Sequence, residues 1–156
     1  MKDIDIRLEL HSNYLSSFYK HDPDSVIIDE LGICQGSSKI DIAVVNGHLW
    51  GWEIKSEKDN LKRLPLQIQY YNKVFDYVTI VVGRNHLEEV KEMVPEFWGI
   101  MEAKNQKGNS LSIKSVRHCK LNPKIEAISL AQLLWKNETL EILERLGKDR
   151  GYKSKP

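Results

Sequence analysis

The stretch that decides the fold runs from residue 39 to residue 56 and reads KIDIAVVNGHLWGWEIKS. Two segments of alternating polarity, 39–45 and 48–55, flank Asn46-Gly47. An Asn-Gly pair between two such segments is the strongest short-range signal for a β-hairpin. The stretch therefore predicts a hairpin. Its charged residues of interest are Asp41, Glu53 and Lys55.

The length of the loop decides which face of the hairpin each side chain takes. A two-residue loop at Asn46-Gly47 places Asp41 opposite Trp52 and mixes charged and apolar side chains on one face. A three-residue loop, a type I turn with Gly47 in the left-handed bulge position, places Asp41 opposite Gly51. Burial favours the second register, because a slip of one residue turns every side chain to the other face.

In the favoured register the hairpin has one apolar face and one face that carries the charges. Asp41 and Glu53 are then diagonal neighbours with Cα atoms about 7–8 Å apart, which lets two carboxylates hold one divalent ion. Gly51 has no side chain and leaves room there. The apolar face comprises Ile40, Ile42, Val44, Trp50, Trp52 and Ile54, and the other face comprises Asp41, Ala43, Val45, Leu49, Gly51, Glu53 and Lys55.

The whole chain has 156 residues, which predicts one domain over residues 1–147 and a basic, mobile tail over 148–156. No apolar run is long enough to span a membrane and the charged N-terminus does not resemble a signal peptide, so we expect a cytoplasmic protein. Cys34 and Cys119 lack ligand-like spacing and are interpreted as reduced thiols. The formal net charge of +1 gives no bulk evidence for nucleic-acid binding, so such evidence must come from local sites.

The rest of the chain predicts further helices and strands. The continuous β-branched run at 77–83 indicates a strand that is buried on both faces and parallel to a neighbour. Ser56 and Asp59 form a capping-box pattern that predicts a short helix over 56–63, and Pro65 suits the first turn of a second helix. The fold class is α/β, a mixed sheet with helices on both faces. The other predicted elements are helices over 5–19, 65–75, 86–94 and 130–146 and strands over 25–30, 98–103 and 111–116.

Two polar side chains on the helix after the hairpin are predicted to face the acids. Gln67 and Tyr71 stand four residues apart, so they project from one side of that helix. A helix that starts soon after Lys55 and folds back onto the sheet brings this side over Asp41 and Glu53. Buried acids are costly unless a cation compensates them, which favours a functional site. Without the acids, a half-buried helix surface would be the better interpretation.

The hairpin and the helix after it resemble the PD-(D/E)XK nuclease superfamily in a set of spaced residues: Asp41, Glu53-Ile54-Lys55, Gln67 and Tyr71. The Gln-x-x-x-Tyr element is similar to that of RecB-like nucleases. One departure is that Ile40, rather than proline, precedes the first acid, at a position that varies widely in the superfamily. The resemblance implies a restriction-endonuclease-like mixed β-sheet with helices on both faces.

A narrower resemblance covers most of the chain. The stretches DELGICQGSSKIDIAVVNG (29–47) and GWEIKSEKDNLKRLPLQIQYYNKVFDYVTIVVG (51–83) look like a family of small, largely uncharacterised bacterial proteins placed in that superfamily. The similarity continues more weakly through VPEFWGIMEA and LLWKNETLEILERLG. The short motif is weakly specific, whereas the longer stretches are much more so.

The resemblance implies roles for the hairpin residues. Asp41 and Glu53 would bind Mg²⁺ or Mn²⁺, hard ions that prefer oxygen ligands, and the backbone carbonyl of Ile54 would be another ligand. The ion would lower the pKa of a bound water and stabilise charge on the phosphate. Lys55 would orient the attacking water and offset the charge that develops at phosphorus.

Residues after the hairpin complete the predicted site. Gln67 would hold the attacking water or a metal-bound water, and Tyr71 would contact the phosphate backbone. Basic residues beside the site either grip flanking DNA phosphates or form a solvated helix face, two interpretations of about equal weight. These basic residues are Lys58, Lys62 and Arg63.

Two further acids compete for an additional metal-binding position. Glu30 ends the strand before the hairpin and can reach the site from a neighbouring strand. Glu9 lies on the first helix, where many superfamily members carry an extra acid. Glu30 is favoured because it lies within the best-matching stretch, and surface charge remains the alternative for both. Trp50 and Trp52 are interpreted as core residues, because the register turns them away from the acids.

The predicted function is a metal-dependent nuclease that hydrolyses DNA phosphodiester bonds, in repair, recombination or phage defence. One alternative is a catalytically silent domain that binds nucleic acid or a partner, because a fold does not guarantee activity. A second alternative is an enzyme acting on RNA or a nucleotide. No extra DNA-reading module is visible, so sequence specificity would need loops, a homodimer or a protein partner.

Overall fold

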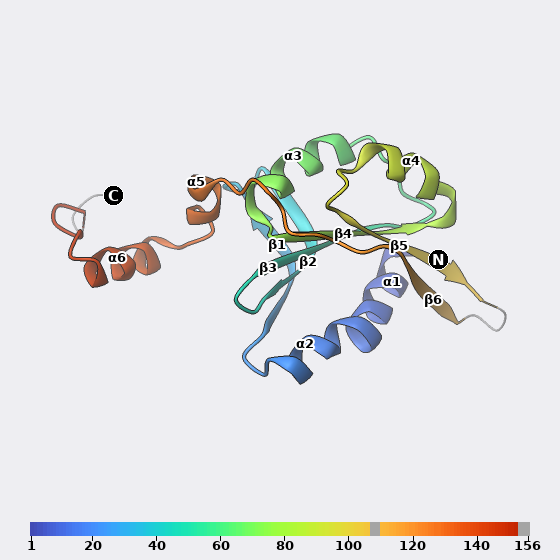
Figure 1. Ribbon diagram of the computed structural model, residues 1–156, viewed down its shortest axis with the longest axis horizontal. Helices are drawn as coiled ribbons and strands as arrows, with labels where there is room; N and C mark the ends of the chain where they lie inside the picture. Colours follow the sequence, from blue (N-terminus) through green and yellow to red (C-terminus); the bar gives the residue numbers. More distant parts are fainter. Residues whose placement is uncertain (107–109, 153–156) are drawn as a thin grey trace.

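The computed structural model describes residues 1–106 and 110–152, which form a six-stranded sheet with helices on both faces (Figure 1). The strands follow one another across the sheet in chain order. The first three and the last two pair antiparallel, whereas β3, β4 and β5 run parallel, so the predicted mixed α/β sheet is confirmed. The strands are β1 (Val26–Ile33), β2 (Ser38–Val45), β3 (Leu49–Lys55), β4 (Tyr77–Gly83), β5 (Gly99–Asn105) and β6 (Leu111–Arg117).

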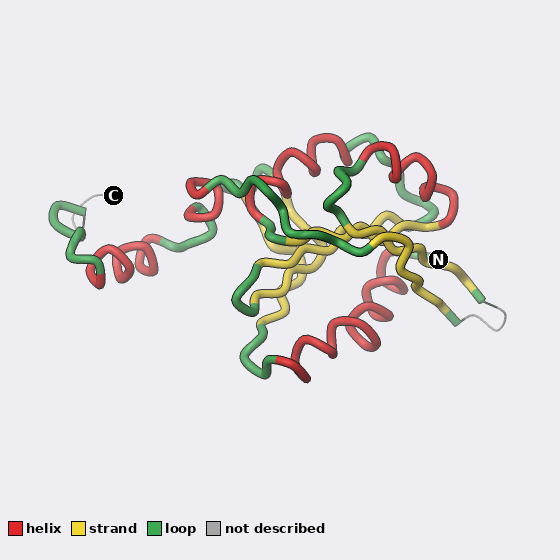
Figure 2. The backbone as a smooth tube through the Cα atoms, in the orientation of Figure 1, coloured by secondary structure: helices red, strands yellow, loops and turns green. Residues whose placement is uncertain are grey.

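Helices that precede and follow the hairpin in the sequence cover opposite faces of the sheet (Figures 1 and 2). The N-terminal helices α1 and α2 lie on one face, and α3 and α4 lie on the other. The helical segments are α1 (Asp3–Glu9), η1 (Leu10–Leu15), α2 (Ser16–His21), α3 (Leu64–Val74), η2 (Arg84–His86), α4 (Leu87–Met93), α5 (Ala127–Ala131) and α6 (Lys136–Arg145). No helix among the described residues is long and apolar enough to cross a membrane.

Two apolar cores lie between the sheet and these helices. The core under α3 and α4, here the α3-side core, contains the fully buried Phe75 and Trp98. The core under α1, here the α1-side core, contains Ile6, Ile42 and Val44. β4 contributes to both cores and pairs parallel with β3 and β5, which confirms the prediction of a doubly buried parallel strand.

The first helix is longer and less regular than its apolar spacing predicts. Between α1 and α2 the chain continues as the π-helical segment η1. Leu10 and Leu15, five residues apart, are both fully buried. In a π-helix the hydrogen bonds join residues five apart, which brings such a pair onto one face. The wider turn thus lets both leucines enter the α1-side core.

The helix predicted over 56–63 is wrong. Ser56 and Asp59 do interact, since the backbone N–H and the hydroxyl of Ser56 both donate to Asp59 Oδ2, at 2.8 and 2.7 Å. The Asp59 N–H also donates to the Ser56 carbonyl at 3.2 Å, so the contacts close a turn. The helix itself begins at Leu64, with Pro65 in its first turn as predicted.

The single helix predicted over 130–146 is also wrong. The structure has α5 and α6 in its place, separated by an irregular segment around Trp135. The Trp135 backbone N–H donates to Glu138 Oε2 at 2.7 Å, which starts a new helix there. α6 has no buried residue and extends away from the sheet (Figure 1). Residues 107–109, between two of the predicted strands, and residues 153–156 of the predicted tail lie outside the described residues.

The hairpin between β2 and β3 has a three-residue loop over residues 46–48. Gly47 is left-handed with a φ of 81°, so the predicted loop length and its left-handed glycine are confirmed. The loop begins one residue later than predicted. Val45 remains in β2 because it pairs with Val26 of β1 as well as with Leu49 of β3.

This loop position changes the register of the two acids. Ala43 lies opposite Gly51, whereas Asp41 was predicted there. Regular pairing ends at Ile42 and Trp52, before it reaches Asp41 and Glu53, so the predicted diagonal pairing of the two acids is not formed. The observed register differs from the predicted one by two residues, which keeps Glu53 on the face of Gly51 and Ala43, because side chains alternate with a period of two.

Gly51 serves packing rather than ion binding. A Cβ at this position would lie 2.4 Å from Ile40 Cδ1 and 3.1 Å from Phe75 Cδ1, so the predicted free space above Gly51 is filled. We expect Gly51→Ala to lower the free energy of unfolding by about 1–3 kcal/mol through overpacking, measured by urea denaturation. Gly32→Ala, where a Cβ meets nothing within 4 Å, is the matched control. Equal stability of the two variants would contradict the prediction.

Candidate active site

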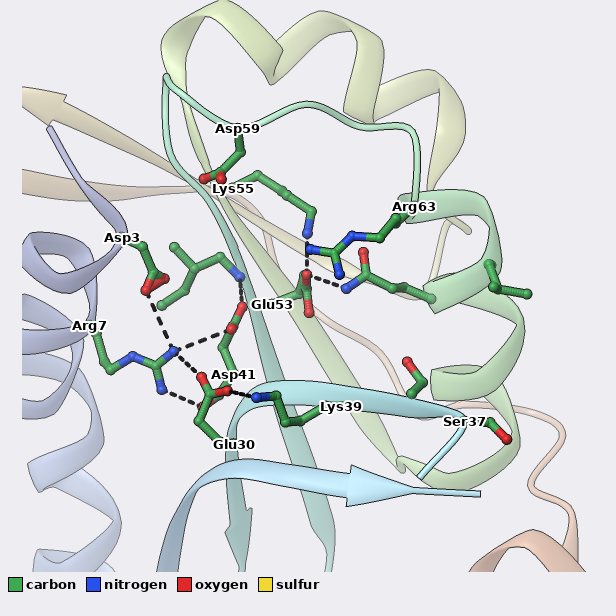
Figure 3. A pocket seen from close by; sticks show the side chains of 14 residues that line it. Asp3, Arg7, Glu30, Ser37, Lys39, Asp41, Glu53, Lys55, Asp59 and Arg63 are labelled. Atoms are coloured by element: carbon green, nitrogen blue, oxygen red, sulfur yellow. Dashed lines mark hydrogen bonds and ion pairs between the residues drawn. The ribbon is translucent and has the colours of Figure 1, made fainter. Parts of the chain in front are cut away.

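A pocket of about 380 Å³ lies at the end of the hairpin away from its loop, between α1, the β1–β2 turn and the first turn of α3 (Figure 3). Its walls bring together charged side chains from segments that are far apart in the sequence. The lining residues are Asp3, Arg7, Glu30, Ser37, Ser38, Lys39, Asp41, Glu53, Ile54, Lys55, Asp59, Arg63, Leu66 and Gln67.

Asp41 lies where the alternation of β2 breaks. Ile40 packs in the α3-side core and Ile42 in the α1-side core, so the two do not share a face as predicted. Regular pairing of β2 with β3 ends at Ile42 and Trp52. Beyond that point Asp41 Oδ2 accepts a 2.7 Å hydrogen bond from the Ile54 N–H. The carboxylate thus takes the place of a strand partner.

The surroundings of Asp41 favour its protonated form. Burial, followed by the negative charge of Glu53, raises the pKa of Asp41 from 3.8 to about 7. The hydrogen bond from Ile54 and the charge of Arg7 act in the opposite direction. A carboxyl group with such a pKa marks a site that is short of positive charge and would gain from a cation.

Glu53 and Lys55 form a buried ion pair at the base of the pocket. Glu53 is 2% exposed and Lys55 is 6% exposed. Lys55 Nζ donates to Glu53 Oε1, and Gln67 Nε2 donates to the same oxygen at 2.7 Å. The hydroxyl of Tyr71 lies 2.6 Å from Glu53 Oε2. Three donors from two elements therefore hold this carboxylate in one position.

Tyr71 does not occupy the position expected of a residue that contacts DNA. Its side chain is fully buried, and its hydroxyl lies 2.6 Å from both Glu53 Oε2 and the carbonyl oxygen of Lys39. Burial and then the charge of Glu53 raise the pKa of Tyr71 above its ordinary value, so the hydroxyl keeps its proton. Tyr71 therefore positions Glu53 instead of reaching a phosphate backbone.

Gln67 presents an acceptor that nothing in the described chain satisfies. Its Nε2 donates to Glu53 and, at 3.2 Å, to the Tyr71 hydroxyl. Its Oε1 is buried and has no hydrogen-bond partner among the described residues. A buried orphan acceptor needs a donor, which in a polar pocket is a water molecule or a ligand.

Arg7 of α1 is a site residue that the sequence did not reveal. Its Nη1 donates to the Asp41 carbonyl at 2.7 Å, and its Nη2 lies 2.5 Å from Glu30 Oε1 and 3.3 Å from Asp41 Oδ1. The only local signal was Asp3 four residues earlier, which pairs with Arg7 at 3.5 Å. That spacing is common on exposed helices and does not indicate a site.

Glu30 lies on the pocket wall, whereas Glu9 lies outside it. Glu30 has a left-handed φ of 58°, and its carboxylate pairs with both Arg7 and Lys39. The hydrogen bond from Lys39 is the largest cause of a lowered pKa of Glu30. Glu9 accepts a hydrogen bond from Asn13 on the exposed side of the helix.

The predicted basic residues fall into two groups. Arg63 lines the pocket, and its side chain makes no hydrogen bond or ion pair within the described part of the chain, which leaves it available to an anion. Lys58 and Lys62 are exposed and do not line this pocket. Lys62 borders a neighbouring pocket instead. Trp50 and Trp52 pack on the α1-side core, away from the acids, as predicted.

The donor set fits a divalent ion held by few protein ligands. Over residues 1–106 and 110–152, no three acidic, histidine or cysteine side chains are grouped so that they could hold a metal. Mg²⁺ commonly uses one or two carboxylates and keeps several waters. Asp41 and Glu53 supply such a pair, the raised pKa of Asp41 shows the deficit of positive charge, and Gln67 Oε1 offers an acceptor for a water.

The fold and the pocket define an α/β protein with buried acidic and basic side chains at the open end of a hairpin. The chain belongs to the bacteriophage P4 protein cII family, whose model matches residues 5–155. It is 30% identical over 124 residues to protein cII of Enterobacteria phage P4, across 80% of this chain and 47% of that protein. The chain thus spans about half the length of the curated relative that it matches.

A solved structure is also similar, the SPO1766 protein of unknown function from Silicibacter pomeroyi. It has a TM-score of 0.48 and 18% sequence identity to this chain, over 89% of this chain and 87% of that one.

The family match corrects the family that was inferred from the motif. Membership of the PD-(D/E)XK superfamily, and of its small bacterial family, was predicted; this assignment is wrong, because residues 5–155 match the cII family model. The motif consists of two acids, a lysine and a Gln-x-x-x-Tyr element. These few residue types recur on hairpins and helices of many proteins, whereas the cII match extends over nearly the whole chain.

Proposed function

We propose that this chain is a Mg²⁺- or Mn²⁺-dependent nuclease that hydrolyses phosphodiester bonds of DNA. One observation carries the proposal: Asp41, Glu53 and Lys55 converge in one pocket in which Arg7 compensates the charge of Asp41 only in part. An ion pair that only stabilises the fold does not need a carboxyl group whose negative charge is incompletely compensated. Perturbed acids in a concave site favour a catalytic role.

The residues of the pocket would have separate roles in hydrolysis. Asp41 and Glu53, with the Ile54 carbonyl, would hold the ion, whereas Glu30 at the rim stays paired with Arg7 and Lys39. When bound, a divalent ion supplies Lewis acidity toward the phosphate and lowers the pKa of a water. Lys55 would offset the negative charge that develops on the phosphate.

Three further residues would orient the reactants. Gln67 Oε1, which lacks a donor in the described structure, would accept a hydrogen bond from the attacking water. Arg63 would bind the phosphate at the pocket mouth, since it lines the pocket and carries an uncommitted charge. Tyr71 would hold the Glu53 carboxylate in place.

The finer arrangement of the sheet is part of this proposal. A restriction-endonuclease-like sheet is supported by an antiparallel hairpin that carries the acids, a crossover helix α3 and a parallel strand β4. A homodimer or another protein would supply sequence specificity, because the pocket itself offers few groups that could read bases. DNA in repair, recombination or phage defence would be the substrate.

A second candidate function is a catalytically silent domain that binds nucleic acid or a partner. The observation that favours it is internal compensation. Glu53 pairs with Lys55, Glu30 pairs with Lys39, and Arg7 contacts Asp41, so the pocket holds its own cations. The raised pKa of Asp41 argues for the nuclease, since that compensation is incomplete.

Incubation with nucleic acid distinguishes the two candidates. The purified chain is mixed with single-stranded, double-stranded and branched DNA, and with RNA, in Mg²⁺, Mn²⁺ or EDTA. We expect wild type to cut DNA with either ion and not in EDTA, and Asp41→Asn to be inactive. Asp24→Asn, at an exposed turn before β1, is the matched control and should cut like wild type. Identical products from wild type and Asp41→Asn would end the nuclease proposal, and equal DNA retention without cutting would support the silent domain.

A further inference from the structure

Arg7 contacts four carboxylates instead of the single one of an ordinary ion pair. Its side chain is 13% exposed, and its guanidinium nitrogens lie 2.5 Å from Glu30, 3.3 Å from Asp41, 3.5 Å from Asp3 and 3.6 Å from Asp29. Figure 3 shows this guanidinium between Asp3, Glu30 and Asp41, on the side of Asp41 that faces α1. One fixed cation is therefore shared among four acids.

We propose that Arg7 is a positioning residue that acts as the resident counter-cation of the metal-free site and competes with the divalent ion for Asp41. The inference rests on the proposed metal site. Arginine stays charged at all relevant pH values, so the competition is permanent. Arg7 thus sets how tightly the site takes a divalent ion, which makes it a determinant of the ion concentration at which the nuclease is active.

The competition follows from the atoms that Asp41 presents. Asp41 Oδ2 already accepts from the Ile54 N–H at 2.7 Å, and Oδ1 faces Arg7 Nη2 at 3.3 Å. An ion between Asp41 and Glu53 needs electron density from the same carboxylate, and the guanidinium charge next to it repels that ion. The Arg7 guanidinium and the divalent ion therefore compete for the Asp41 carboxylate.

The packing of α1 gives Arg7 a fixed anchor and an alternative position. Ile6 on the same helix and Leu10 at the start of η1 are fully buried, so the backbone of Arg7 cannot move away from the site. The guanidinium can give up Asp41 and keep Asp3 and Asp29, whose side chains are 42% and 48% exposed at the outer side. Release of Asp41 then requires a side-chain rotation rather than a shift of the helix.

The other two cations of the pocket that pair with acids, Lys55 and Lys39, do not share this property. Lys55 pairs with Glu53, and the proposed chemistry needs it there. Lys39 pairs with Glu30 from a side chain that is 59% exposed, so solvent screens it. Arg7 is the partly buried cation in contact with Asp41 itself.

The test measures binding of Mn²⁺ alone by isothermal titration calorimetry, without nucleic acid. We expect Arg7→Met to bind Mn²⁺ about 5- to 10-fold more tightly than wild type, because a nearby positive charge is gone. Its melting temperature in EDTA should fall by about 5 °C, because four acids lose their counter-ion. Arg7→Lys, which keeps the charge, should bind Mn²⁺ within about twofold of wild type.

The outcomes separate this inference from the proposed function. Binding of Mn²⁺ by Arg7→Met that is equal to or weaker than that of wild type overturns the counter-cation role, and so does tightening in Arg7→Lys equal to that in Arg7→Met. Absence of Mn²⁺ binding in wild type and in every Arg7 variant overturns the metal site itself. Should Arg7→Met fail to fold by circular dichroism, Arg7→Gln, which retains two N–H donors, gives the same comparison.

Discussion

Replacement of Lys55 by methionine is expected to lower the rate of DNA cleavage by a factor of about 10²–10³, because the charge that offsets the developing negative charge on the phosphate is lost. The same variant should lose about 3–5 kcal/mol of stability in EDTA, since it leaves Glu53 as a buried charge without its cationic partner. Cleavage is measured under single-turnover conditions, and stability by urea denaturation.

A second lysine–glutamate pair provides the matched control. Lys91 and Glu88 lie on α4, with side chains that are 39% and 81% exposed. Lys91→Met should therefore change stability by less than about 1 kcal/mol and leave cleavage at the wild-type rate. The contrast isolates burial, because both variants remove a lysine that is paired with a glutamate.

Divalent ions should restore part of the stability that Lys55→Met loses. An ion at Asp41 and Glu53 returns positive charge to the buried carboxylate, and binding to the folded state alone stabilises it. Mn²⁺ should thus raise the stability of Lys55→Met by more than that of wild type, while cleavage stays low. If cleavage by Lys55→Met in Mn²⁺ matches that of wild type, Lys55 has no part in the chemistry.

Asp41→Asn is expected to be more stable than wild type at pH 8 in EDTA, although it is inactive as a nuclease. The pKa of Asp41 is raised from 3.8 to about 7, first by burial and then by Glu53. Ionising this group in the folded protein at pH 8 therefore costs at most about 4 kcal/mol relative to the unfolded chain. Asparagine keeps an acceptor for the Ile54 N–H and carries no charge.

The sign of the pH dependence follows from the raised pKa. Between pH 3.8 and about 7 the folded state binds the Asp41 proton more strongly than the unfolded state does. The stabilising effect of that proton is complete below pH 3.8 and is lost as the pH rises through about 7. Wild type should therefore lose stability relative to Asp41→Asn, by about 3 kcal/mol between pH 5 and pH 8.

Urea denaturation of both proteins in EDTA at pH 5 and pH 8 measures this gap. Asp24→Asn, at an exposed aspartate, is the control and should show no comparable change relative to wild type. A gap between wild type and Asp41→Asn that is the same at both pH values would mean that Asp41 is already ionised at pH 5. A stable but inactive Asp41→Asn also shows that loss of cleavage does not come from unfolding.

Local patterns in the sequence predict much of the fold. The hairpin around Gly47, the doubly buried strand β4 and the helix that begins near Pro65 were all predicted, because each depends on dihedral preferences or on side-chain periodicity over a few residues. The turn at Ser56 was not, because the same side-chain hydrogen bond can start a helix or close a turn. Only the chain that follows decides between the two.

In the candidate site too, local patterns predict some contacts and not others. The spacing within β3 and α3 predicts that Glu53, Lys55 and Gln67 meet, and the structure brings them together. The pairing of Asp41 with Arg7 joins residues 34 positions apart, and no local pattern indicates it. The burial of Tyr71 depends on the α3-side core that covers it, so its contact with Glu53 replaces the expected contact with DNA.

The sequence by itself determined where the hairpin lies and which residues carry charge on it. Tertiary structure alone decided the register fixed by β1, the break in β2 at Asp41 and the sharing of Arg7 among four acids. The physical reason is that alternation and turns arise from the backbone of neighbouring residues, whereas burial and the contact of charges depend on segments that meet only when the chain is folded. The raised pKa of Asp41, on which the proposed function depends, comes from such burial and charge contacts in the folded chain.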